Sequence, residues 1–135
     1  MRFRLSLRQA NAQTKAARCD GGFIRLYNGT RPTDADTALS GNTLLATGGY
    51  SNPAFGAADS TGTCTSNAIS SETNAPNAGT ATFARLFESD GTTVVADVSV
   101  GIAGSGAELI VSTLTIGAGA TVVFLTQSLQ DPVGN

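Results

Sequence analysis

From residue 22 onward, apolar and polar residues alternate in short runs that are separated by glycine- and asparagine-containing turns. Alternation over four to eight residues is typical of strands that bury one face, and such spacing favours a sandwich or barrel over alternating helices and strands. We predict an all-β fold with two packed sheets, jelly-roll-like in topology, and an N-terminal arm or short helix outside it. The expected strands are residues 23–27, 43–47, 63–69, 80–89, 92–100, 108–116 and 121–129.

Two glycine-containing dipeptides are expected to set where strands of this region turn or end. The segments 80–89 and 92–100 are joined by Asp90-Gly91, a dipeptide typical of a type I′ hairpin turn. The second of these strands has an apolar face and a polar face, so we expect one face on a core and the other toward solvent or a partner. Gly48-Gly49 is expected to end the strand at 43–47.

The first 21 residues have a different pattern. Residues 3–7 alternate apolar and polar side chains, which predicts an extended arm. Residues 8–18 are rich in good helix formers and precede a glycine pair, which predicts a short helix; a helix throughout is the alternative. We therefore divide the chain into a basic arm or helix at residues 1–21, a β-sandwich domain at 22–130 and a C-terminal tail at 131–135.

The net charge of −2 hides an uneven distribution. Residues 1–31 carry seven of the eight basic side chains and one acid, which gives +6, whereas residues 32–135 carry one basic side chain and nine acids, which gives −8. A basic end on an acidic body is typical of an arm that docks on an acidic surface, and equally of a terminus that carries its charges into solvent. We expect no direct contact with nucleic acid, because the basic segment lacks a row of aromatic residues on which bases could stack.

Catalytic chemistry has little support in the composition. The chain contains no His, which removes the commonest general base and metal ligand. The charged fraction is 13%, about half the ~25% of typical soluble domains. Asp34 and Asp36 could offer carboxylates to a cation, but alternating acids in a proline-led loop are more typical of turns. We therefore expect a non-enzymatic protein without a cofactor or a bound metal.

The two cysteines, Cys19 and Cys64, are too few for a disulfide framework and lack the partners of a zinc site. The basic opening of the chain is not followed by the apolar segment of a secretory signal, so we expect both thiols to be reduced and buried. No apolar run approaches the ~18–20 residues of a membrane-spanning helix, and no membrane partner is expected.

An ordered series of segments carries a resemblance to a known class of proteins. The segments are FIRLY (23–27), NGTRPTDADTALSG (28–41), TLLAT (43–47), SNPAFGAA (51–58), AISS (68–71), GTATFARL (79–86) and SDGTTV (89–94). Over roughly residues 22–127, the chain resembles small structural proteins of tailed bacteriophages, in particular the jelly-roll cement, or decoration, proteins of HK97-like capsids.

The resemblance implies a virion component that is present in many copies and performs no chemistry. It implies a cement protein on the outer surface of the phage head, assembled in the bacterial host cytoplasm, that binds the major capsid protein and associates with itself as a dimer or trimer. A module of the tail or neck is the alternative.

The arm supplies the expected contact with the capsid. In this interpretation its arginines pair with acidic capsid groups, and residues 3–7 add an extended strand to a sheet edge of the capsid. Because the arm is expected to lie outside the sandwich, removal of residues 1–19 should leave the β-domain folded and weaken capsid binding. The expected capsid-contact residues are Arg2, Phe3, Arg4, Leu5 and Arg8.

Overall fold

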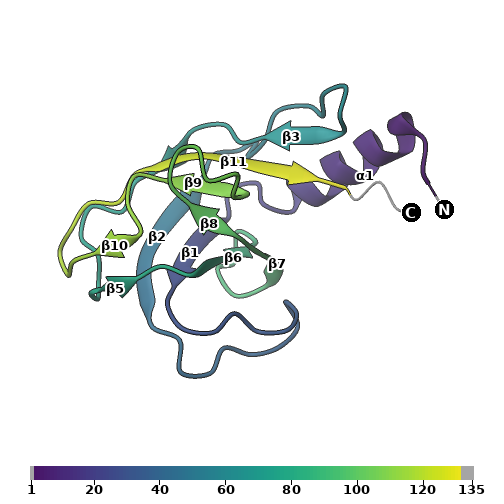
Figure 1. The fold of residues 1–135 in the computed structure, drawn as a ribbon. Helices are drawn as coiled ribbons and strands as arrows, with labels where there is room; N and C mark the ends of the chain where they lie inside the picture. The colour runs from purple at the N-terminus through teal and green to yellow at the C-terminus, as the bar shows by residue number, and fades with distance from the viewer. Residues whose placement is uncertain (1, 132–135) are drawn as a thin grey trace.

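The chain forms one N-terminal helix and two main β-sheets in a computed structural model that describes residues 2–131 (Figure 1). One sheet has five strands in the order β4-β2-β1-β6-β7 and is antiparallel throughout. Its strands are β1 (Phe23–Tyr27), β2 (Leu44–Tyr50), β4 (Ile69–Ser70), β6 (Phe83–Phe87) and β7 (Val94–Val98).

The other main sheet has four strands in the order β3-β11-β9-β8, antiparallel except between β8 and β9. Its strands are β3 (Thr63–Thr65), β8 (Val100–Gly101), β9 (Leu109–Val111) and β11 (Phe124–Gln130). A short antiparallel pair is formed by β5 (Gly79–Thr80) and β10 (Thr115–Ile116). The prediction of a mainly β protein is confirmed, and the arrangement is consistent with a β-sandwich.

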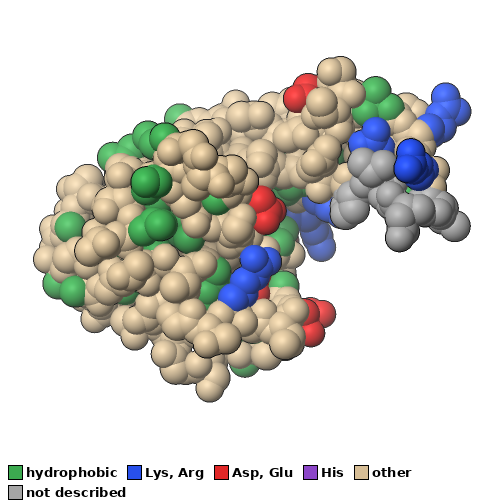
Figure 2. Space-filling model, in the orientation of Figure 1, with side chains coloured by type: hydrophobic (Ala, Val, Ile, Leu, Met, Phe, Trp, Pro, Cys, Tyr) green, Lys and Arg blue, Asp and Glu red, His purple; other side chains and the backbone are tan. Residues whose placement is uncertain are grey.

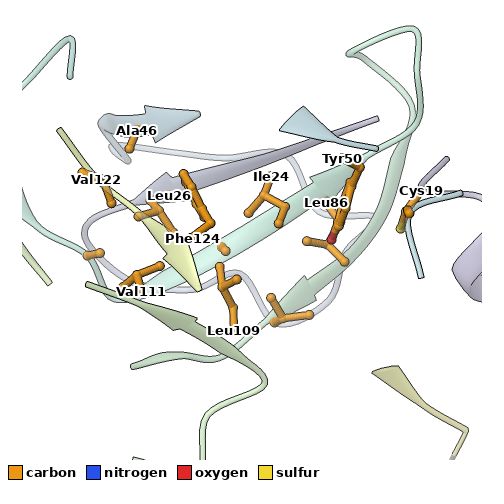
Figure 3. Packing of buried hydrophobic residues seen from close by; sticks show 14 of the residues in the cluster. Cys19, Ile24, Leu26, Ala46, Tyr50, Leu86, Leu109, Val111, Val122 and Phe124 are labelled. Atoms are coloured by element: carbon orange, nitrogen blue, oxygen red, sulfur yellow. The ribbon is translucent and has the colours of Figure 1, made fainter. Parts of the chain in front are cut away.

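The hydrophobic core lies between the inner faces of the two main sheets (Figure 3). Its large side chains are at most 6% exposed, and burial of each contributes roughly 1.5–3 kcal/mol to folding. Both sheets supply them, among them Ile24, Leu26, Leu86, Leu109, Val111 and Phe124.

The expectation that Gly48-Gly49 ends a strand is wrong, because β2 continues to Tyr50. Gly48 pairs with Ile24 of β1 and is buried. A Cβ atom at this position would lie 2.8 Å from two ring atoms of Phe124 on the opposite sheet. The glycine therefore lets an aromatic ring approach the backbone of β2 closely, and it does not make a turn.

Two of the predicted runs divide between the sheets. Residues 63–69 give β3 in one sheet and β4 in the other, and residues 92–100 give β7 and β8 in the same way. Both pieces of such a run keep the period of two, so alternation alone does not reveal where the chain crosses from one sheet to the other.

The predicted hairpin is confirmed, since β6 and β7 pair antiparallel, but the predicted type I′ turn is wrong. That turn needs positive φ at both central residues, and only Gly91 has it, with φ of 72°. Asp90 instead accepts hydrogen bonds from the Thr93 hydroxyl and from the backbone N–H groups of Thr92 and Thr93. These bonds stabilise the carboxylate and lower the pKa of Asp90 to about 2.

The helix predicted at residues 8–18 is confirmed, but it begins earlier: α1 (Leu5–Ala17) includes residues 5–7 of the predicted extended arm, and only the backbone before Leu5 is not helical. Helical spacing gathers Leu5, Ala12 and Ala16 on one face, and Ala12 is fully buried. This face packs against β3 and β11, so the expectation that the segment lies outside the sandwich is also wrong. The alternation in 3–7 does not produce a strand, because it is followed by small buried residues at helical spacing, which favour a helix on this side of the core.

The C-terminal end of β11 is tied to the helix. Asp131 accepts a hydrogen bond from Lys15 and a longer one, at 3.5 Å, from Asn11. The first residue of the predicted tail is therefore fixed, and residues 132–135 lie outside the described residues.

Cys19 and Cys64 are free and fully buried, as predicted, and burial raises the pKa of the Cys19 thiol to about 12.

Candidate functional site

The N-terminal end of α1 presents three of the five expected capsid-contact residues to solvent. Arg2, Phe3 and Arg4 are exposed, and 43% of the surface of Phe3 is accessible. Arg4 has an extended backbone, with φ of −67° and ψ of 153°, and its side chain makes no capping hydrogen bond. We restrict the name basic arm to residues 2–4, the part of the predicted segment 1–21 that precedes the helix: it places one aromatic side chain between two cations.

The other two expected contact residues, Leu5 and Arg8, are half-buried and turn toward the body of the protein. The Arg8 guanidinium donates to the carbonyl oxygens of Phe3 and Thr61, each at 3.3 Å. One turn on, the Gln9 side chain donates to the carbonyl oxygen of Asp59 at 2.7 Å. Arg8 therefore fixes the start of the helix to the loop before β3.

At this end of the molecule, the basic arm carries the positive charge that no acidic side chain of residues 2–131 neutralises. Lys15 is paired with Asp131, and Arg18 lies 3.9 Å from Glu88. The hydrogen bond from Lys15 lowers the pKa of Asp131. Within residues 2–131 the arginines of the arm form no ion pair. Figure 2 shows basic side chains gathered around the helix end, whereas most of the remaining face is uncharged.

The outer face of the five-stranded sheet carries a layer of arginine and aromatic side chains. In β1 and β6 the sequences FIRLY and FARLF share an aromatic-x-Arg-x-aromatic pattern, and the strands pair with Arg25 opposite Arg85. Arg85 is 4% exposed and donates two hydrogen bonds to Asp97 of β7, at 2.6 and 2.9 Å. The Arg25 guanidinium lies 4.4 Å from the centre of the Phe87 ring.

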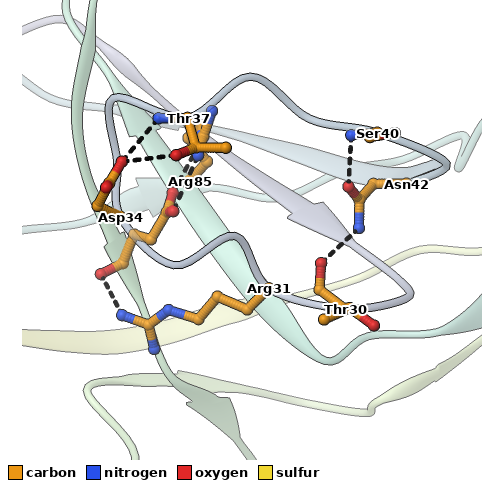
Figure 4. Close-up of polar contacts among 8 residues, drawn as sticks. Thr30, Arg31, Asp34, Thr37, Ser40, Asn42 and Arg85 are labelled. Atoms are coloured by element: carbon orange, nitrogen blue, oxygen red, sulfur yellow. Dashed lines mark hydrogen bonds and ion pairs between the residues drawn. The ribbon is translucent and has the colours of Figure 1, made fainter.

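A long loop, residues 28–43, lies over this layer (Figure 4). Arg31 of the loop donates to the backbone carbonyl oxygen of Asp97 at 2.9 Å. Asp34 accepts from the backbone N–H and the hydroxyl of Thr37, each at 2.8 Å. The turn-forming interpretation of Asp34 is thus confirmed, and the hydroxyl bond lowers the pKa of its carboxyl group.

The buried Arg85–Asp97 pair was missed by the sequence interpretation. The polar face of β7 was expected to meet solvent or a partner, and for Asp97 this is wrong, because its side chain is 3% exposed. Hydrogen bonds to Asp97 raise the pKa of Arg85, so its guanidinium stays charged. The available signal was the shared aromatic-x-Arg-x-aromatic pattern. When two strands with this pattern pair, the two arginines lie opposite each other, and such like charges call for a carboxylate nearby.

Two further properties concern the acidic and thiol side chains and the helix of residues 2–131. No three His, Cys, Asp or Glu side chains in this range are grouped as a metal site would require. The single helix of this range has neither the length nor the hydrophobicity of a transmembrane span. Searches of protein-family models, curated proteins and solved structures found no match to the chain. The geometry presents an exposed basic and aromatic surface, residues 2–4, at the end of a helix that packs on the β-fold.

Proposed function

We propose that the chain is a non-enzymatic structural protein of a tailed-phage virion, most specifically a cement protein on the outer surface of the head. It bridges neighbouring subunits of the major capsid protein and stabilises them against the pressure of packaged DNA. The observation that carries this proposal is the basic arm: Arg2, Phe3 and Arg4 are exposed and unpaired within residues 2–131, at the end of a helix that is anchored in the core.

We also propose a jelly-roll-like topology for the two sheets. The chain crosses between them repeatedly: β2 and β4 belong to the five-stranded sheet while β3, between them in sequence, belongs to the other. It crosses again between β7 and β8. Such interleaved connections hold both sheets together as one unit, which suits a protein whose role is mechanical.

The proposed mechanism is adhesion through many weak contacts. Exposed ion pairs contribute only about 0.2–1 kcal/mol each, so two arginines hold one copy weakly. A lattice presents the same acidic surface many times, and copies that associate on the head as a dimer or trimer, through surfaces other than the arm, bind several of these acidic surfaces at once. Multivalency therefore supplies the strength that a single arm lacks.

Binding to emptied phage heads tests this role of the arm. We expect the Arg2→Gln/Arg4→Gln double variant to bind heads about tenfold more weakly than the native protein, because two exposed ion pairs are lost. Native binding should weaken with added salt, since exposed charges are screened over ~8 Å at physiological ionic strength. The measurement is co-sedimentation of purified protein with heads over a range of concentrations.

The matched control is Arg31→Gln, which removes one exposed cation from the loop over the sheet and leaves the basic arm intact. It should bind heads as the native protein does. Equal binding by the native protein and the double variant at low salt would contradict the proposed contact.

A further inference from the structure

A pocket of about 170 Å³ opens beside the free edge of β7, between the two sheets and the last turn of α1. Its floor is apolar and includes Leu86 and Val98, which are at most 4% exposed. Its rim includes the exposed side chains of Lys15, Glu108 and Gln130. The volume equals that of about five or six water molecules, or of one large apolar side chain.

One polar group in the lining of this pocket lacks a partner. Gln127 is fully buried, and its Oε1 atom accepts a hydrogen bond from the hydroxyl of Tyr50. Its Nε2 atom has no hydrogen-bond partner within residues 2–131. Rotating the amide would only transfer the deficit to the oxygen, because the Tyr50 hydroxyl can serve one of the two atoms. A buried donor without a partner is costly. Because Nε2 has almost no accessible surface, the Gln127 amide must turn toward the pocket to donate to an acceptor that an occupant brings.

The charges at the rim select a cationic occupant. Lys15 is paired with Asp131, and Asp97 is paired with Arg85. Glu108 is exposed and forms no ion pair within residues 2–131. The pocket thus fits a large apolar side chain that is flanked by cations and preceded by a free peptide carbonyl.

The basic arm has this chemistry. Phe3 is exposed between Arg2 and Arg4, and the carbonyl oxygen of Arg2 accepts no hydrogen bond within residues 2–131. The arm cannot reach the pocket of its own molecule, because α1 extends about 15 Å between Leu5 and Lys15 at the rim. An arm that fills the pocket must come from another copy.

We propose that in the free protein this pocket binds the basic arm of a second copy. The Phe3 ring lies on Leu86 and Val98, the arginines face Glu108, and a peptide carbonyl of the arm accepts from Gln127. Arm and pocket are different surfaces. Two copies can therefore exchange arms reciprocally in a dimer, or further copies can bind head to tail in a ring or a filament. The inference concerns the free protein and does not rest on the virion proposal; on a head, the arm would leave the pocket for the capsid surface.

Analytical ultracentrifugation of the purified full chain tests the proposal. We expect the native protein to associate with increasing concentration, and Phe3→Ala to weaken this association about tenfold or more through loss of the aromatic anchor. Leu7→Ala is the matched control, because Leu7 is also 43% exposed but lies on the outward face of the helix. It should associate as the native protein does.

A charge exchange locates the contact at Glu108. Glu108→Arg and Arg2→Glu/Arg4→Glu should each be monomeric alone, because like charges then meet at the rim. A mixture of the two should associate, since the substituted pocket of one and the substituted arm of the other carry opposite charges. A native protein that stays monomeric at every concentration, or association that is indifferent to Phe3 and Glu108, would overturn the proposal. Glu108→Arg should still bind heads, which separates this inference from the capsid role.

Discussion

Replacing Asp97 by alanine is expected to lower the free energy of unfolding by about 3–5 kcal/mol, because it leaves the Arg85 guanidinium charged and unpaired in the protein. The two side chains are 5% and 3% exposed, so water cannot replace the lost carboxylate. This loss is a large part of the roughly 5–15 kcal/mol that holds a domain of this size folded. Urea unfolding followed by far-ultraviolet circular dichroism measures it.

Two further variants show whether the loss comes from the buried charge. Asp36→Ala removes an exposed acid from the loop over the sheet and should change the free energy of unfolding by no more than about 0.5 kcal/mol. The double variant Arg85→Leu/Asp97→Leu should recover most of the stability, because it removes both charges together. A loss below about 1 kcal/mol for Asp97→Ala would mean that the pair is not buried in solution.

The second large effect is expected at Ala12, where substitution by aspartate should destabilise the protein by about 3–5 kcal/mol. Ala12 is fully buried between α1 and the sheet that contains β3 and β11, so the acidic group would lose its contact with water there. The same urea unfolding experiment measures the change in free energy.

Ala10→Asp provides the matched control for this substitution. Ala10 belongs to the same helix but is exposed, so the change in stability should stay within about 0.5 kcal/mol. Equal effects of the two substitutions would show that the helix is not docked.

Removal of residues 1–19 is no longer expected to leave the β-domain folded, because the deletion would take Ala12, Ala16 and Cys19 out of the core.

The sequence predicted the β-architecture well because alternation reports directly on which face of a strand is buried. Residues 23–27 match β1 in both bounds, and the hairpin of β6 and β7 follows from Asp90-Gly91. Long-range effects account for the errors. Gly48 sits within a strand because Phe124, far away in the sequence, needs the space, and no local pattern carries that information.

The candidate site was predicted only in part for the same reason. A basic end is visible in the composition, and Arg2, Phe3 and Arg4 are exposed as a contact surface requires. Whether Arg8 is free depends on Thr61, which the fold brings to the helix from more than fifty residues away. The pocket beside β7 is formed by residues from both sheets and the helix, so its existence depends on packing that local patterns do not encode.

The copy number of the chain in purified phage particles tests the central claim most directly. Quantitative mass spectrometry against the major capsid protein gives this number. A cement protein that covers the head lattice should be present in hundreds of copies per particle, on the same scale as the capsid subunits it bridges. About a dozen copies or fewer would contradict the account and assign the chain to the neck or tail.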